Sequence, residues 1–179
     1  RLGARVTVHA NAVIGGDGLG YATHDGAHHK IPAAGTVVID DDVEIGAGCT
    51  IDRASVGVTS IGAGTKLAAQ VAIGHGCRIG RHNLFVGQVG LAGSVTTGDH
   101  VVFGGQAGVA GHLHIGARAR IAAQAGVMTD VPAGVDYGGM PAGPLHEAKR
   151  IALAARRLPD FAQRLRRLER HLDLDAEDR

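Results

Sequence analysis

Histidine is the residue type whose number and placement first suggest chemistry in this sequence. There are eleven histidines in 179 residues, and two of them lie beside glycines: His75 between two glycines and His112 directly after one. An imidazole titrates near neutral pH and can take a proton from an attacking amine or hydroxyl, so each could act in general acid–base catalysis. The glycine neighbours alone do not separate a catalytic base from an exposed surface histidine, and both interpretations stay open at this point.

The elements that position these histidines follow from a repeat of six residues. Stepping by six from Ile61 to Val127 gives twelve positions, of which eleven are apolar and only Thr97 is polar. The residue two places before each step is mostly small or β-branched, and the residue after it is usually Gly or Ala. The stepping positions are Ile61, Leu67, Ile73, Ile79, Phe85, Leu91, Thr97, Phe103, Val109, Ile115, Ile121 and Val127.

Each hexad predicts one short strand followed by a turn. The stepping residue and the one two before it should point inward, because strand side chains alternate between faces. The small residue after the step should permit the tight corner. Three hexads then make a triangular coil of eighteen residues, and successive coils stack ~4.8 Å apart as parallel strands. A β-sandwich would not keep a period of six over this length, and leucine-rich repeats have a longer period.

The fold class expected is therefore an all-β solenoid, a left-handed parallel β-helix of hexapeptide repeats with a C-terminal α-helical extension. The left-handed winding is a known exception to the right-handed crossover rule. The expected domains are the β-helix at residues 1–132, a Pro/Gly linker at 133–144, and C-terminal helices and tail at 145–179. Upstream of Ile61 we expect a four-residue insertion near 54–58 and a longer excursion at 16–34.

This coil places His75 and His112 on its outer surface. His75 comes two residues after the inward Ile73, and His112 lies 37 residues further on, which is two coils plus one residue. They should be about 10 Å apart along the axis. That distance is too long for mutual contact but suits two roles beside an extended substrate.

Other site chemistries are not favoured. Some β-helix enzymes hold zinc with three histidines that include a His-x4-His pair, and this sequence has no such pair. His24, His28 and His29 come closest, but they lie in a polar segment at 21–30 that we expect to be a solvated loop, so no metal is expected. The glycine-rich runs at 15–20 and 87–90 do not join a strand to a helix, which excludes dinucleotide and phosphate loops.

Composition narrows the class of protein further. Gly accounts for 29 residues, Trp is absent and aromatic residues make up 3%, so the interior must be thin and repetitive. A net charge of +1 gives no reason to expect nucleic acid. Two cysteines give no disulfide framework, no apolar run has the ~20 residues of a transmembrane segment and no signal peptide is visible, so we expect a cytoplasmic protein. Because the chain opens on Arg1 within patterned sequence, we expect a fragment with material missing upstream.

The C-terminal part should be helical and basic. A helix is predicted from Leu145 to Arg157 with Pro144 at its first turn, and a second at 160–172 after a break at Pro159. Two carboxylates, Asp160 and Glu169, oppose eight basic residues between positions 149 and 170. This surface could be a solvated face against a neighbouring subunit or could dock an acidic protein. The basic residues are Lys149, Arg150, Arg156, Arg157, Arg164, Arg166, Arg167 and Arg170.

Several motifs, in order along residues 13–172, give a more specific likeness. The chain resembles the UDP-3-O-(3-hydroxyacyl)glucosamine N-acyltransferases of lipid A biosynthesis, which are hexapeptide-repeat acyltransferases. This resemblance is far more specific than the hexad, which many acyltransferases share. The motifs are Ile-Gly-Gly-Asp-Gly-Leu-Gly-Tyr-Ala at 14–22, Lys-Ile-Pro at 30–32, Val-Glu-Ile-Gly-Ala-Gly-Cys-Thr-Ile-Asp-Arg at 43–53, Gln-Val-Ala-Ile-Gly-His at 70–75, Gly-Gln-Val-Gly-Leu-Ala-Gly-Ser at 87–94, Gly-Gln-Ala-Gly-Val-Ala-Gly-His-Leu at 105–113 and Gly-Gly-Met-Pro at 138–141.

The resemblance implies a homotrimer with three sites in the grooves between adjacent β-helices. Such an enzyme moves a 3-hydroxyacyl chain from acyl carrier protein to the 2-amino group of a UDP-3-O-acylglucosamine. It binds no cofactor of its own, because the carrier protein delivers the acyl chain on its 4'-phosphopantetheine arm. The resemblance makes His75 the catalytic base, Gly93 the donor of an oxyanion-stabilising N–H and His112 a second functional histidine.

Further positions follow from the same resemblance. Met128 falls near the acyl-chain groove, with Gln70 and Gln88 also assigned to the substrate or this groove, and Lys149 and Arg150 match a basic pair that meets the carrier protein.

The sequence also departs from the family pattern. Ala68-Ala69 stand where Asp-Asn is usual, Gly76 replaces an Asn, Ala148 replaces a Trp, and the family's N-terminal uridine-binding domain is not expected within these residues. Two alternatives therefore remain: another hexapeptide acyltransferase that uses acyl-CoA on a different amino-sugar, or a non-catalytic paralogue that keeps the scaffold.

Overall fold

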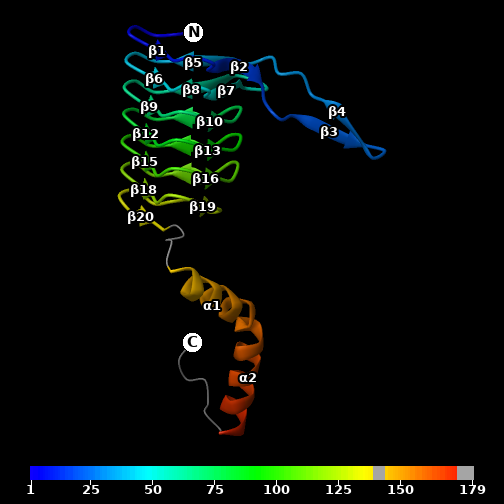
Figure 1. Ribbon diagram of the computed structural model, residues 1–179. Helices are drawn as coiled ribbons and strands as arrows, with labels where there is room; N and C mark the ends of the chain where they lie inside the picture. The colour runs from blue at the N-terminus through cyan, green and yellow to red at the C-terminus, as the bar shows by residue number, and fades with distance from the viewer. Residues whose placement is uncertain (139–143, 173–179) are drawn as a thin grey trace. The chain divides into compact units, whose positions relative to one another are not determined.

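The computed structural model describes residues 1–138 and 144–172. The chain divides into two compact units, Arg1–Met140 and Pro141–Arg179. The first unit is a stack of short parallel strands that wind around one axis, as Figure 1 shows. Its strands form three parallel sheets, and the hydrophobic core fills the space that the sheets enclose. The expected fold class, a parallel β-helix followed by helices, is confirmed.

Each sheet collects one strand from successive coils. The first sheet contains β1 (Thr7–Val8), β6 (Glu44–Ile45), β9 (Lys66–Leu67), β12 (Leu84–Phe85), β15 (Val102–Phe103), β18 (Arg120–Ile121) and β20 (Asp136–Tyr137). The second contains β2 (Val13–Asp17), β7 (Thr50–Arg53), β10 (Ala72–Ile73), β13 (Gly90–Leu91), β16 (Gly108–Val109) and β19 (Gly126–Val127). The third contains β5 (Thr36–Ile39), β8 (Val58–Ile61), β11 (Arg78–Ile79), β14 (Thr96–Thr97) and β17 (His114–Ile115).

The pairing register confirms the eighteen-residue coil. Phe85 pairs with Phe103, and Leu91 pairs with Val109, each eighteen residues further along the chain. Upstream, Ile39 pairs with Ile61, a separation of 22 residues, as the four-residue insertion required. The periodic apolar residues therefore stack on their equivalents in the next coil.

The core consists of the inward positions that the hexad predicted. Every stepping residue is buried, and so is every residue two places before it except Leu113, which is partly buried. The polar exception, Thr97, is buried as well. Its hydroxyl accepts hydrogen bonds from the side-chain amide of Asn83 at 2.7 Å and from the N–H of Gly80 at 3.0 Å. A buried polar group is tolerated when it is hydrogen-bonded, and this internal pair meets that condition.

The corners correct one expectation about glycine. The left-handed backbone lies at the third corner residue, which is often not glycine: His82, Gln88 and His112 have φ of 53°, 64° and 64°. The residue directly after each step is small for a different reason: the backbone of the next coil lies too close to leave room for a larger side chain. A Cβ at Gly62 would lie 2.6 Å from the carbonyl oxygen of Gly80. Close approach between backbones, and not the turn itself, excludes larger side chains there.

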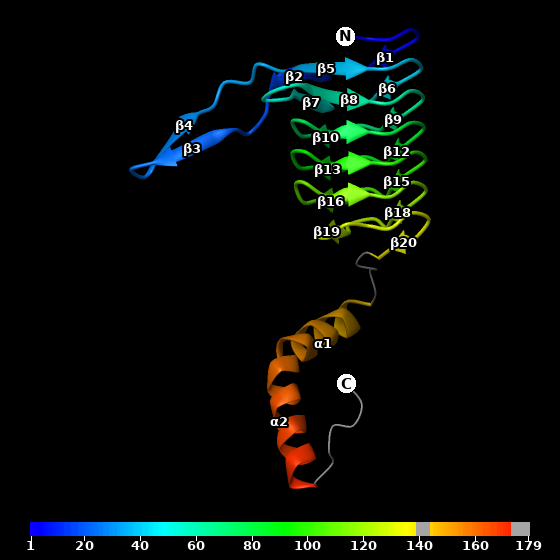
Figure 2. The same cartoon turned by 180° about the vertical axis from the view of Figure 1, so that it is seen from behind.

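The excursion at 16–34 is more ordered than the solvated loop expected at 21–30. Strands β3 (Tyr21–His24) and β4 (Ala27–Lys30) form an antiparallel hairpin in which every residue is exposed. It extends sideways from the N-terminal end of the stack in both views (Figures 1 and 2). Asp25 and Gly26, with φ of 48° and 76°, form the two-residue turn of this hairpin, which the polar composition alone did not indicate.

Two boundaries near the C-terminus also differ from expectation. The linker expected from 133 begins later, because Asp136 of β20 pairs with Arg120 and continues the coil. Residues 139–143 and 173–179 lie outside the described residues. In the second unit, α1 spans Leu145–Arg156 and α2 spans Leu158–His171. Helix α2 starts before Pro159 because proline is accepted in the first turn of a helix. In place of the break predicted at Pro159, only Arg157 separates the two helices.

Neither of these helices has the length and apolar character that a membrane crossing requires, within the described part of the chain.

Candidate functional site

The predicted catalytic residues lie at one corner of the coil, on successive turns. His75 is in the corner that joins β10 to β11, Gly93 in the corner from β13 to β14 and His112 in the corner from β16 to β17. Parallel pairing of Ile73 with Leu91, and of Leu91 with Val109, brings these corners into line. Neighbouring corners are also hydrogen-bonded, because Ser94 N–H donates to the carbonyl of His75 at 2.8 Å and His112 N–H donates to that of Gly93 at 3.0 Å.

The environments of the two histidines differ. The His75 residue is half-buried, whereas His112 is exposed at its corner. The imidazole of His75 lies against Gly93, where an added Cβ would be 2.6 Å from Nε2 and 2.7 Å from Cε1. Only glycine therefore leaves room for this ring in its present position. The two residues that the sequence placed one coil apart are in close contact.

The N–H of Gly93 is a free hydrogen-bond donor as far as residues 1–138 and 144–172 are concerned. At another corner the corresponding N–H, that of Arg81, is bound by the Asp99 carboxylate one coil further on, at 2.7 Å. The residue that corresponds to Asp99, one coil beyond Gly93, is Gly111, which has no side chain to accept a hydrogen bond from the Gly93 N–H. An unpaired donor beside an imidazole Nε2 can accommodate a developing negative charge.

A carboxylate that the sequence reasoning left without a role also lies near His75. Asp52 is partly buried in β7, whose neighbouring residue Ile51 pairs with Ile73. Burial raises the pKa of Asp52, the charge of His75 opposes that rise, and Asp17 adds to it. The signal was present, since Asp52 precedes His75 by one coil, the four-residue insertion and one further residue. This spacing could place Asp52 beside His75 only once the insertion was known to lie between β7 and β8.

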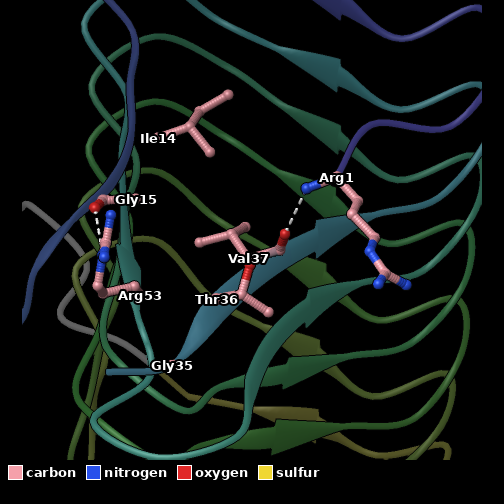
Figure 3. Close-up of a pocket in the computed structure, with 7 residues that line it drawn as sticks. All are labelled: Arg1, Ile14, Gly15, Gly35, Thr36, Val37 and Arg53. Atoms are coloured by element: carbon pink, nitrogen blue, oxygen red, sulfur yellow. Dashed lines mark hydrogen bonds between the residues drawn. The ribbon is translucent and has the colours of Figure 1, made fainter. Parts of the chain in front are cut away.

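A set of ion pairs holds the segment before the hairpin against the coil. Arg53 Nε donates to the carbonyl of Gly15 at 2.7 Å, an anchor visible in Figure 3. Lys30 lies 3.0 Å from the carboxylate of Asp17, and Arg53 lies 3.9 Å from it. The hydrogen bond to Asp17 raises the pKa of Lys30. These contacts fix the chain between Gly15 and Asp17, which leads directly past His75.

The two predicted glutamines lie elsewhere. Gln70 and Gln88 occupy the preceding corner and form a ladder with Gln106 and Gln124, in which each amide nitrogen donates to the oxygen of the glutamine one coil earlier at 2.7–2.8 Å. The second sheet separates this ladder from His75. Its outward positions are small residues, namely Ala72, Gly90, Gly108 and Gly126. The structure thus does not bring these glutamines to the histidine corner.

Met128 does lie in line with the histidine corner. It follows β19 and takes the corner position that Gly74, Ala92 and Ala110 hold on earlier coils, and it is 75% exposed. Lys149 and Arg150 are both exposed on α1, in the second unit. Their assigned role in docking remains a prediction.

Comparison with known proteins adds independent findings. No protein-family model matches the chain. It is 55% identical over 174 residues to UDP-3-O-acylglucosamine N-acyltransferase 1 of Gloeobacter violaceus, with 97% of this chain and 50% of that protein covered. It is 51% identical over 180 residues to the UDP-3-O-acylglucosamine N-acyltransferase of Syntrophobacter fumaroxidans, covering 96% of this chain and 51% of that one. The chain spans about half the length of these curated relatives.

Solved structures agree on the architecture. The UDP-N-acetylglucosamine acyltransferase of Francisella novicida matches with a TM-score of 0.66 and 31% identity over 83% of this chain and 54% of that one. LpxA from Acinetobacter baumannii matches with a TM-score of 0.66 and 25% identity over 84% of this chain and 65% of that one.

Coils of hexapeptide turns that stack as parallel strands define a hexapeptide-repeat protein of the parallel β-helix type, the architecture that the chain shares with the solved acyltransferases. Within that class, the chain belongs to the family of UDP-3-O-acylglucosamine N-acyltransferases, as its motifs indicated.

Proposed function

We propose that the protein of which this chain is the β-helix body is an N-acyltransferase of lipid A biosynthesis. It moves a 3-hydroxyacyl chain from acyl carrier protein to the 2-amino group of a UDP-3-O-acylglucosamine. The observation that carries the proposal is the contact of His75 with Gly93, whose N–H is unpaired among the described residues. Relatives named for this activity share 51–55% of the sequence.

The geometry suits general-base catalysis of acyl transfer. His75 Nε2 takes a proton from the amine as the nitrogen attacks the thioester carbonyl carbon. A carbon–nitrogen bond forms, and the carbonyl oxygen becomes an oxyanion that the Gly93 N–H stabilises. When the intermediate collapses, the carbon–sulfur bond breaks and the imidazolium returns its proton to the departing thiolate.

The remaining predicted residues are assigned to substrate and partners. His112, two coils below His75, would bind the substrate or steady the transition state. Met128, one coil further, would bound the groove for the acyl chain. Gln70 and Gln88 would act on the substrate only from the opposite edge of the second sheet, across its small outward residues. We assign homotrimer formation to the β-helix.

Docking of the carrier protein is assigned to Lys149 and Arg150. Both are exposed on a helix with basic residues along its length, which suits an acidic partner that arrives by electrostatic attraction. The 4'-phosphopantetheine arm of that partner would then deliver the thioester to the histidine corner.

The test is His75→Ala, assayed for acyl transfer from acyl carrier protein to UDP-3-O-acylglucosamine. The expected loss is about 10²- to 10⁴-fold in kcat, the range for removal of a general base. His82→Ala is the matched control, because His82 is an exposed histidine at a different corner. Unchanged turnover of His75→Ala would exclude His75 as the base.

A parallel assay with acyl-CoA separates the donor hypotheses. The proposal requires a higher kcat/KM with acyl carrier protein. Ala68 and Ala69, which replace polar residues usual in the family, make the acceptor the second variable to compare.

A further inference from the structure

A second glycine, distant in sequence, contacts the candidate base. Gly18 follows β2, and a Cβ added to it would lie 2.7 Å from Cβ and 2.8 Å from Cδ2 of His75. Real side chains do not approach so closely, so either the chain at Gly18 or the imidazole would have to move. Gly18 does not need to be glycine for its own backbone, because its φ lies outside the left-handed region. The space is occupied by His75.

Gly18 and Gly93 together enclose the imidazole. Gly18 contacts the Cβ–Cδ2 side of the His75 side chain, whereas Gly93 contacts the Nε2–Cε1 end. A side chain held at both ends has little freedom to leave its rotamer. The other glycines of the same segment have no such role: an added Cβ at Gly16 would find its nearest neighbour at 3.9 Å, and one at Gly20 at 3.7 Å, both ordinary contacts.

The segment that carries Gly18 is itself fixed to the coil. We call residues 15–18 the strap. Arg53 of β7 holds its first residue through the carbonyl of Gly15 at 2.7 Å, as Figure 3 shows. Lys30, at the end of β4, holds Asp17 at 3.0 Å. The strap therefore has one attachment to the strand that carries Asp52 and another to the base of the hairpin.

We propose that the strap is a positioning element for catalysis and that Gly18 is its positioning residue. It holds the imidazole of His75 so that Nε2 stays at the Gly93 N–H, where the thioester carbonyl must lie. Gly18 is not a catalytic residue, because it acts through His75. The proposal rests on the function assigned above to His75. The carboxylate of Asp52, from β7, lies near the ring, and Asp17 of the strap acts on that same carboxylate.

The experiment compares Gly18→Ala with Gly20→Ala, a control just beyond the strap where a methyl group has room. Gly18→Ala should lower kcat by about 100-fold, the effect of a misplacement near 1 Å, with KM for both substrates unchanged. Gly20→Ala should match the wild type in kcat and in both KM values.

A readout independent of turnover is carbethoxylation of His75 by diethyl pyrocarbonate, followed by peptide mass spectrometry on the 179-residue chain. The displaced, more exposed imidazole of Gly18→Ala should react severalfold faster, whereas the other histidines should keep their rates. If the wild-type chain transfers no acyl group, the proposed function fails for this chain, but this reactivity still tests the positioning.

Equal His75 reactivity and equal kcat in Gly18→Ala and wild type would overturn the proposal. Should Gly18→Ala fail to fold, Asp17→Asn serves instead, because it adds no atoms and loosens the strap from Lys30. Like Gly18→Ala, Asp17→Asn should raise the reactivity of His75 and lower kcat, but by smaller factors. Wild-type values in Asp17→Asn would then contradict the strap's role.

Discussion

Replacement of Thr97 by Val separates the sequence pattern from the structure, because the two predict opposite signs for the change in the free energy of unfolding. As the one polar residue among twelve stepping positions, Thr97 invites replacement by Val, which would complete the apolar series. The structure predicts that Thr97→Val is destabilising. The Thr97 hydroxyl is the only acceptor described for the Gly80 N–H, at 3.0 Å, and it also accepts from Asn83 Nδ2 at 2.7 Å.

The magnitude follows from these two hydrogen bonds. Val has the shape of Thr but no acceptor, so the partly buried Gly80 N–H is left unpaired, at a cost of about 1–3 kcal/mol. The Asn83 side chain keeps two bonds, which limits the loss there: its nitrogen donates to the carbonyl of Gly98 at 3.1 Å, and its oxygen accepts from the Val101 N–H at 2.7 Å. The additional apolar burial returns less than ~1 kcal/mol. A net destabilisation of about 2 kcal/mol is expected.

Urea unfolding followed by circular dichroism measures this difference. With a slope of ~2 kcal/mol/M, the midpoint of Thr97→Val should fall by about 1 M. Thr97→Ser keeps the acceptor and should lose less, and Thr50→Val, an exposed threonine on β7, should stay within ~0.5 kcal/mol of the wild type. A Thr97→Val variant at least as stable as the wild type would refute the buried-network reasoning.

Three further outcomes follow from the structure. Gly93→Ala places a methyl group against the His75 imidazole and should lower kcat at least tenfold in the acyl-transfer assay, whereas Gly90→Ala, whose methyl meets open space, should leave kcat unchanged. Burial raises the pKa of Cys77 to about 11, so iodoacetamide at pH 8 should alkylate this thiol only after unfolding; labelling of the native protein at the unfolded rate would contradict its burial. Arg120 lowers the pKa of Asp136, so their pairing should add stability above the ordinary carboxyl pKa and lose it as pH falls through the lowered value; unfolding curves of Arg120→Ala and wild type should therefore converge in acid and in high salt.

The repeat architecture was predictable because its cause is local and periodic. A period of six in apolar residues, with alternation inside each strand, suffices to place every stepping residue in the core and to align His75, Gly93 and His112 at one corner. The register of successive coils follows from the same period, since slipping by one residue would expose the whole apolar set. The hexad thus determined both the fold and the column that the candidate site occupies.

Irregular segments could not be predicted in the same way. The hairpin at β3 and β4 interrupts the period, so its pairing had no template in the repeat. The role of Thr97 depended on a partner, Asn83, 14 residues earlier, at an inward position that is mostly small or β-branched in the repeat. The start of α2 before Pro159 depended on how the two helices join.

What the sequence alone determined is the coil and the alignment of the site residues along it, because both arise from spacing that repeats every eighteen residues. What only the tertiary structure decided is the environment of His75. Gly18 lies 57 positions earlier, beyond a hairpin and an insertion, and Asp52 lies on the other side of that insertion. Contacts across segments that break the period depend on how the backbone returns to the coil, which no local pattern encodes. The exposed His112 and the enclosed His75 are therefore distinguished by packing and not by spacing.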